Sequence, residues 1–329
     1  QNGKINLLKA ESIADLISSE TEIQRQQAIK IMSGKSATKF NSLRERLLKI
    51  LSNIEAKIDF PEEDLPKNIL KNIHSEAQSI RNEIGNILND QKVGERIREG
   101  FKIAILGPPN VGKSSLLNYL SRRNIAIVSE IAGTTRDVIE AHLNLDGYPV
   151  VISDTAGIRE SKNEIEKKGI KLALKRAENA DLNIFMMDPK SLDFTDFLSN
   201  FGSKKSILVI NKIDLGFEYN NNEIEKYESV KISIKQQKNL DELINLIKKK
   251  LTNKFISQED VFITRKRHRT NLEKCVEHLS NFEKKNSIED FDKAAEDLRL
   301  ATRALGKIVG NVDVEEILGS IFSDFCIGK

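Results

Sequence analysis

The sequence predicts a mostly parallel α/β domain inserted into an all-helical domain. Three observations lead to this expectation. Apolar residues recur at helical spacing before residue 99, short apolar runs alternate with helical segments from 99 to 257, and helical patterns return from 258 to the end. We expect the two outer parts to pack as one domain, which gives helical parts at 1–98 and 258–329 and an α/β domain at 99–257.

Three helices are expected before residue 99. The first carries a stripe of five residues, Leu7, Ala10, Ile13, Ala14 and Ile17. The second has its apolar face at Phe40, Leu43, Leu47, Ile50, Leu51 and Ile54. A break around Pro61 follows, because proline interrupts regular hydrogen bonding, and the third helix is predicted from about 66 to 98.

The middle of the chain contains the strand candidates. Apolar, partly β-branched runs predict strands at 101–106, 182–187, 206–210 and 229–232. Asp146-Gly147 between 138–145 and 148–153 predicts a β-hairpin. Helices are expected at 114–120, 164–177, 193–200 and 239–251. This alternation is typical of a parallel sheet with helices on both faces.

The composition is that of a globular protein, with 39% hydrophobic and 31% charged residues and a formal net charge of +3. Cys275 and Cys326 are too few and too far apart to predict a disulfide framework or a zinc site. No apolar run approaches the roughly 20 residues that span a bilayer. We therefore expect a cytoplasmic protein, and the start at Gln1 suggests a natural chain that is longer at its N-terminus.

A phosphate-binding motif follows the first predicted strand, at Gly107-Pro108-Pro109-Asn110-Val111-Gly112-Lys113-Ser114. This strand–loop–helix context is the one that a P-loop needs. Lys113 is expected to reach the β- and γ-phosphates, Ser114 to ligate Mg²⁺, and Ser115 to lie in the same site. The helix N-terminus adds positive potential.

The choice of base is indicated by Asn211, Lys212 and Asp214, which follow the strand at 206–210. A carboxylate there accepts from N1–H and the 2-amino group of guanine, whereas adenine offers no such pair of donors. Ser233, Ile234 and Lys235 follow the next strand and are expected to close over the base. The sequence thus predicts a P-loop GTPase and argues against a kinase or ATPase.

Two further motifs are expected to contact the γ-phosphate. Asp154 in Asp154-Thr155-Ala156-Gly157 would hold Mg²⁺ through water, and Gly157 would offer its N–H to the phosphate. Thr135, after Gly133-Thr134, is the candidate switch ligand of Mg²⁺. The next residue after Gly157 is Ile158, which cannot orient the attacking water. From the residues alone, Arg159, Glu160, Glu164 and Glu166 all stay open as replacements.

Taken together, these residues resemble the MnmE (TrmE) family of bacterial tRNA modification GTPases over essentially the whole chain. Beside the P-loop, four stretches carry the resemblance: 58–64, 131–137, 154–160, and the terminal Cys326-Ile327-Gly328-Lys329. The resemblance implies GTP hydrolysis to GDP and phosphate, in the modification of C5 of the tRNA wobble uridine. It also implies a partner, the FAD-dependent protein MnmG (GidA), and self-association through the GTPase domains in the GTP state.

The resemblance further implies roles for particular residues. K⁺ ligands match Asn110, Ser129, Ile131 and Thr134, and the loop over the nucleotide includes Glu130, Ala132 and Gly133. The carboxylate that orients water matches Glu166. Lys4 and Lys329 match contacts to 5-formyl-tetrahydrofolate, which the family binds with an N-terminal domain that is absent from this sequence.

One alternative function is a ribosome-assembly GTPase, in which hydrolysis is a timer for RNA binding. Such proteins share the switch motifs but usually append a β-rich or KH-like RNA-binding domain. The outer parts of this chain are predicted to be helical and end in the Cys-Ile-Gly-Lys motif, which favours tRNA modification.

Overall fold

The computed structural model describes residues 5–59, 69–123, 140–153, 175–189, 205–216, 227–255, 261–285 and 291–310. The chain divides into two compact units. The helical unit comprises 1–19, 24–98 and 260–329, and the α/β unit comprises 20–23 and 99–259.

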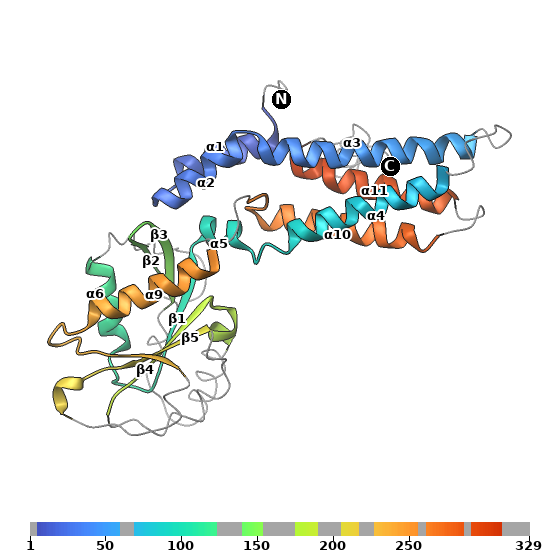
Figure 1. Ribbon diagram of the computed structural model, residues 1–329. Helices are drawn as coiled ribbons and strands as arrows, with labels where there is room; N and C mark the ends of the chain where they lie inside the picture. Colours follow the sequence, from blue (N-terminus) through green and yellow to red (C-terminus); the bar gives the residue numbers. More distant parts are fainter. Residues whose placement is uncertain are drawn as a thin grey trace, which may run out of the picture. The chain divides into compact units, whose positions relative to one another are not determined.

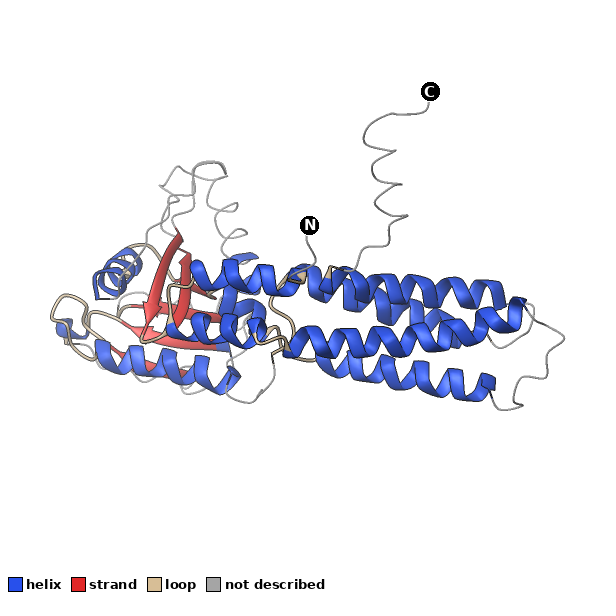
Figure 2. Ribbon diagram, turned by 90° about the horizontal axis from the view of Figure 1, so that it is seen from above, coloured by secondary structure: helices blue, strands red, loops and turns tan. Residues whose placement is uncertain are grey.

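Four long helices form a bundle in the helical unit (Figures 1 and 2). They are α3 (Lys35–Asp59), α4 (Ile69–Leu88), α10 (Lys266–Glu283) and α11 (Phe291–Val309). Helix α3 contacts α4 and α11, and α10 contacts the same two helices from the other side of the ring. One apolar core joins them, and it includes Phe40, Leu47, Ile84, Leu279 and Leu298. Segments from both ends of the sequence therefore share a single core.

Three shorter helices complete the described part of this unit: α1 (Leu7–Ile17), α2 (Glu22–Met32) and α5 (Val93–Glu99). The sequence patterns did not predict α2. The helix predicted from 66 to 98 is wrong as one continuous element, because α4 ends at Leu88 and α5 begins at Val93. Between them, Gln91 and Lys92 have φ values of 51° and 59°. This left-handed conformation is incompatible with an α-helix and ends the first segment.

Helix α1 is a helix as predicted, but its apolar stripe does not face the core. The five stripe residues are all exposed, while Leu8 and Ser12 on the opposite face are buried. Ion pairs instead hold α1 to the start of α10. Glu11 accepts from both Arg267 and His268, and Asp15 accepts from Arg265 at 2.6 Å.

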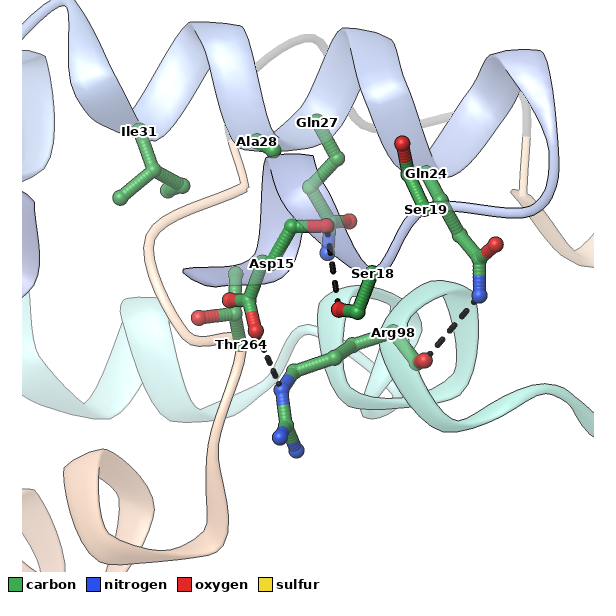
Figure 3. Close-up of a pocket in the computed structure, with 9 residues that line it drawn as sticks. All are labelled: Asp15, Ser18, Ser19, Gln24, Gln27, Ala28, Ile31, Arg98 and Thr264. Carbon is green, nitrogen blue, oxygen red and sulfur yellow. Dashed lines mark hydrogen bonds and ion pairs between the residues drawn. The ribbon is translucent and has the colours of Figure 1, made fainter. Parts of the chain in front are cut away.

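A small polar cavity of about 70 Å³ lies beside this contact (Figure 3). Its lining comes from α1, α2, the end of α5 and Thr264. Across it, the Arg98 guanidinium donates to Asp15, and the Gln24 amide donates to the Arg98 carbonyl at 3.1 Å. The Gln27 amide donates to the carbonyl of Gly94 at 2.9 Å. These bonds fix α5 against α1 and α2.

Six described strands form one sheet in the α/β unit (Figures 1 and 2). They are β1 (Phe101–Leu106), β2 (Glu140–Leu145), β3 (Tyr148–Ser153), β4 (Leu182–Met187), β5 (Ser206–Ile210) and β6 (Glu228–Lys231). Their order is β2-β3-β1-β4-β5-β6, and only the β2–β3 pair is antiparallel. This mostly parallel sheet confirms the predicted α/β class.

The predicted hairpin is present. Asp146 and Gly147 at its turn both have positive φ, at 48° and 96°, as a type I′ turn requires. Helix α6 (Lys113–Arg123) follows β1, and α9 (Leu240–Phe255) follows β6. The predicted helix at 193–200 lies outside the described residues, as does most of that at 164–177, of which 175–177 are helical.

The central strands are buried along their whole length. Every residue of β4 and β5 is buried, and side chains including Leu106, Phe185 and Leu208 pack into one cluster. Because β1, β4 and β5 are parallel, their carboxyl ends lie at one edge of the sheet, where ligands of such sheets bind. No described helix is both long and apolar enough to cross a membrane.

Candidate nucleotide site

The loop after β1 depends on a glycine at its first position. Gly107 has φ 152°, and a Cβ there would lie 2.2 Å from the carbonyl oxygen of Met186 in β4. No side chain fits that gap without moving backbone. The loop therefore leaves the sheet in close contact with the neighbouring strand, as the motif predicts.

The second glycine of the loop contacts a different neighbour. Gly112 has φ 103°, and a Cβ there would lie 2.5 Å from the side-chain nitrogen of Asn211. Asn110 is also left-handed, at φ 62°. The loop is thus shaped by two glycines and one strained asparagine, and it is pressed against the segment expected to bind the base.

The P-loop lysine lies over its own loop. The Nζ of Lys113 donates to the carbonyl oxygens of Gly107 at 2.9 Å and Pro108 at 2.7 Å. Lys113 is the first residue of α6, and the next two residues, Ser114 and Ser115, are exposed at this helix N-terminus. Backbone N–H groups and the helix dipole make this a favourable place for an anion.

Asn211 ties three loops together. It is 4% exposed, its amide nitrogen donates to the carbonyl of Val111 at 2.7 Å, and its amide oxygen accepts from the backbone N–H of Ile234 at 3.2 Å. The first bond reaches the P-loop and the second reaches the loop after β6. Asn211 therefore fixes the phosphate side of the site relative to the base side.

Asp214 and Ser233 form the base side. The Ser233 hydroxyl, which is fully buried, donates to Asp214 Oδ1 at 2.6 Å. The hydroxyl in turn accepts from the backbone N–H of Gln236 at 3.2 Å. The hydrogen bond from Ser233 lowers the pKa of Asp214 below its ordinary value. At neutral pH this carboxylate is ionised and acts purely as an acceptor.

Lys212 forms an ion pair with a residue that the sequence motifs do not include. Its Nζ donates to Oδ2 of Asp188 at 2.7 Å. Asp188 directly follows β4, at the same edge of the sheet as the P-loop. A polar residue after a fully buried parallel strand is the signal that could have singled it out.

The structure brings together half of the predicted site. The P-loop residues, the segment from Asn211 to Asp214, and the loop from Ser233 to Lys235 meet at one edge of the sheet. Several predicted residues lie outside the described residues: Lys4, the loop 129–135, Asp154 to Gly157, the carboxylate candidates Glu160, Glu164 and Glu166, and Lys329. Their roles stay predictions.

Comparison with known proteins supports the same reading of the chain. A profile described as the MnmE helical domain matches residues 7–326. The tRNA modification GTPase MnmE of Pelagibacter ubique is 71% identical over 329 residues, which is all of this chain and 74% of that protein. The chain belongs to the MnmE family. The MnmE of Rickettsia akari is 46% identical over 332 residues, again with 74% of its length covered.

Solved structures that are similar include GTP-binding domains. The G domain of the T. maritima FeoB iron transporter is 29% identical, covers 47% of this chain and 98% of its own, and has a TM-score of 0.35. A GTP-binding protein from Sulfolobus solfataricus, solved with GDP, is 20% identical over 69% of this chain and 71% of its own, with a TM-score of 0.36. The assignment to MnmE rests on the sequence relatives.

Proposed function

We propose that this chain binds GTP at the edge of its parallel sheet and hydrolyses it to GDP and phosphate in tRNA modification. The single observation that carries the proposal is Asn211, whose buried amide joins the P-loop to the loop after β6, where Ser233 donates to Asp214. This bond pair connects a phosphate cradle with a guanine-type acceptor. The names of the relatives supply the biological setting, which is tRNA modification.

Base selection follows from the charge of Asp214. Its ionised carboxylate can accept from N1–H and the 2-amino group of guanine, but it cannot donate to adenine. With adenine bound, the carboxylate would lose solvent without gaining a partner, and that loss is what rejects the wrong base. Ser233 holds the carboxylate in place through Oδ1.

The residues present fit a Mg²⁺–phosphate group. Gly107 and Gly112 let the loop pack closely against Met186 and Asn211, and Lys113 donates to carbonyl oxygens of that loop. Ser114, exposed at the start of α6, would supply a hydroxyl ligand to Mg²⁺. Thr135 and, through water, Asp154 would complete the set. When bound, Mg²⁺ neutralises phosphate charge, and Lys113 supplies a further cation.

We also propose that K⁺ stimulates hydrolysis. Asn110, which matches the K⁺ ligand of the family's P-loop, has a left-handed backbone conformation with φ 62°. Ser129, Ile131 and Thr134 would be the other ligands, and Glu166 would orient the attacking water in place of Ile158. GTP turnover should then be faster in K⁺ than in Na⁺ at equal ionic strength, and equal rates would remove K⁺ from the proposal.

The wider setting is proposed from the family. The chain would act with the FAD-dependent partner MnmG on C5 of the wobble uridine, and its α/β units would associate in the GTP state. Folate binding, with contacts at Lys4 and Lys329, would require the full-length protein. Mass spectrometry of wobble uridines in a strain without the full-length gene separates this function from ribosome assembly. A role in tRNA modification predicts loss of the modified uridines, whereas a role in ribosome assembly predicts the same level of modified uridines as in the parent strain.

The decisive test of the site is Asp214→Asn. Replacing an acceptor oxygen by a donor should lower GTP affinity by about a hundredfold or more and should raise affinity for xanthosine triphosphate, whose base offers an acceptor at that position. Asp241→Asn is the matched control, because Asp241 is largely exposed and pairs with Arg123 away from the site. Unchanged GTP affinity in Asp214→Asn would remove Asp214 from the site.

A further inference from the structure

Asp188 is a buried carboxylate at the nucleotide edge that none of the GTPase motifs contains. Its side chain is 10% exposed, and it faces the ammonium of Lys212 at 2.7 Å. The Lys212 side chain is 35% exposed, so the carboxylate is the more buried member of the pair. Burying a carboxylate costs free energy even when it is paired. The presence of such a pair beside the proposed nucleotide site therefore calls for a functional explanation.

The backbone places this pair. Met187, the last residue of β4, pairs with Ile210 of β5, and its carbonyl accepts from the N–H of Asn211 at 2.8 Å. The hydrogen bonding between the two segments therefore continues for one residue beyond the strands. Asp188 and Lys212 are the next residues on each side. The backbone of Lys212 has φ 63°, a strained value for a non-glycine residue, and its side chain is held by the ion pair with Asp188.

Lys212 has a second carboxylate close by in sequence, that of Asp214. If the ammonium were not held by Asp188, the negative charge of Asp214 would attract it. An ammonium on Asp214 would occupy the acceptor that guanine needs and would have to be displaced by each incoming nucleotide. Because Asp188 holds the ammonium, the apolar stem of Lys212 is available to the site while its charge stays away from Asp214.

We propose that Asp188 is a positioning residue for guanine recognition: it holds the ammonium of Lys212 away from Asp214, so that the carboxylate of Asp214 stays available to the base. This inference rests on the proposed guanine site. It adds a specificity-determining residue from β4 to a site otherwise built from the P-loop and the loops after β5 and β6.

The first test is Asp188→Asn in the whole chain, with GDP and GTP affinities measured by titration with fluorescent nucleotide analogues. We expect affinity to fall about ten- to hundredfold, the range for losing a hydrogen bond to a charged group. Turnover at saturating GTP should stay within about twofold, because Asp188 is proposed to act through Lys212 on the base side of the site. Raising the salt concentration should recover part of the affinity, since salt screens the new attraction between Lys212 and Asp214.

The second test separates positioning from a merely structural role. Lys212→Met removes the ammonium but keeps an apolar stem, so adding it to Asp188→Asn should restore most of the lost affinity. Asp181→Asn is the matched control. Asp181 is a buried acid at the other end of β4, where it accepts from the N–H of Lys102 at 3.0 Å. It should lower the melting temperature without changing affinity.

The outcomes are distinct. If Asp188→Asn lowers affinity and Lys212→Met does not restore it, the positioning role is wrong. If Asp188→Asn binds nucleotide like the wild type while Asp214→Asn does not, the inference fails and the guanine site stands. If neither Asp188→Asn nor Asp214→Asn changes nucleotide affinity, the proposed guanine site itself fails. Should Asp188→Asn not fold, Asp188→Ser, which also removes the charge, is measured in the same series with the same expectations.

Discussion

The nucleotide edge of the sheet and the α1–α10 contact of the helical unit both hold polar groups out of water, but they use them differently. In the helical unit the charges satisfy one another: Glu11 accepts from Arg267 and His268, and Arg269 donates to two acids. At the sheet edge, hydrogen bonds and the Lys212–Asp188 ion pair hold loops in place, and left-handed residues such as Asn110 and Lys212 remain among them.

The difference indicates what the polar interactions of each region contribute to. Strained backbone costs about 1–3 kcal/mol per residue and persists where surrounding structure holds it. Strain at the sheet edge is therefore expected to serve binding, whereas the closed ion pairs of the helical unit serve its folding. Variants in the helical unit should change the free energy of unfolding and leave nucleotide affinity alone. The three predictions below test that division.

The largest effect is expected from Arg269→Ala. The Arg269 side chain is 10% exposed and donates to Asp90, Glu95 and the carbonyl of Leu88. Its loss leaves two acids without their cation, and breaking a buried pair in this way costs about 3–5 kcal/mol. Chemical denaturation should show that decrease in the free energy of unfolding, while GTP affinity stays within about twofold of the wild type.

Arg299→Ala is the control for that measurement. Arg299 also pairs with acids, Glu55 and Glu296, but its side chain is 52% exposed. Exposed pairs contribute about 0–1 kcal/mol. Equal destabilisation by the two variants would mean that burial does not set the strength of these pairs. A large loss of GTP affinity in Arg269→Ala would contradict the division between the two regions.

A smaller effect is expected from Gly94→Ala in α5. A Cβ there would lie 2.1 Å from the carbonyl oxygen of Ile263 and 2.3 Å from a methyl carbon of Val261, so backbone must shift. Overpacking of this kind costs about 1–3 kcal/mol. Gly85→Ala in α4 meets nothing within 4 Å and should instead raise stability by about 0.5–1 kcal/mol, the helix propensity gain. Thermal melting of the pair should therefore move in opposite directions.

The strands could be predicted closely because β4 and β5 are short apolar runs whose residues are all buried, and Asp146-Gly147 marks the turn between β2 and β3. Helices were harder. Residues 89–92 are all polar, but apolar residues resume at Val93 and Ile97, so the prediction of one helix passed through the left-handed Gln91 and Lys92. The stripe of α1 predicts a helix correctly but not its burial, because acids on another face of α1 pair with α10.

The described half of the candidate site could be predicted because it is made of contiguous motifs. Glycine spacing alone specifies the P-loop, and Asn211 and Asp214 lie in one turn. Asp188 could not be predicted in the same way. Its role depends on the pairing of β4 with β5, which brings it to Lys212 from more than twenty positions away in sequence.

The smallest effect concerns the acid dependence of stability. Burial raises the pKa of Glu11, but hydrogen bonds from His268 and Arg267 outweigh it and lower the pKa from 4.5 to about 2. As the pH falls below about 4.5, the unfolded chain takes up a proton on Glu11 before the folded chain does. The stabilisation by Glu11 is thus present above that pH and is lost toward pH 2.

Glu11→Gln should therefore make the loss of stability between pH 4.5 and 2 shallower, by up to about one proton in the slope of unfolding free energy against pH. Burial lowers the pKa of His268, so its own contribution is lost in a higher window, as the pH falls below 6.5. Denaturant titrations at several pH values below 4.5 isolate the part due to Glu11. Glu296→Gln, at a largely exposed acid, should leave the slope unchanged. If Glu11→Gln behaved like that control, the carboxylate would have the same pKa in the folded and unfolded chains, and its contacts with α10 would not contribute to acid stability.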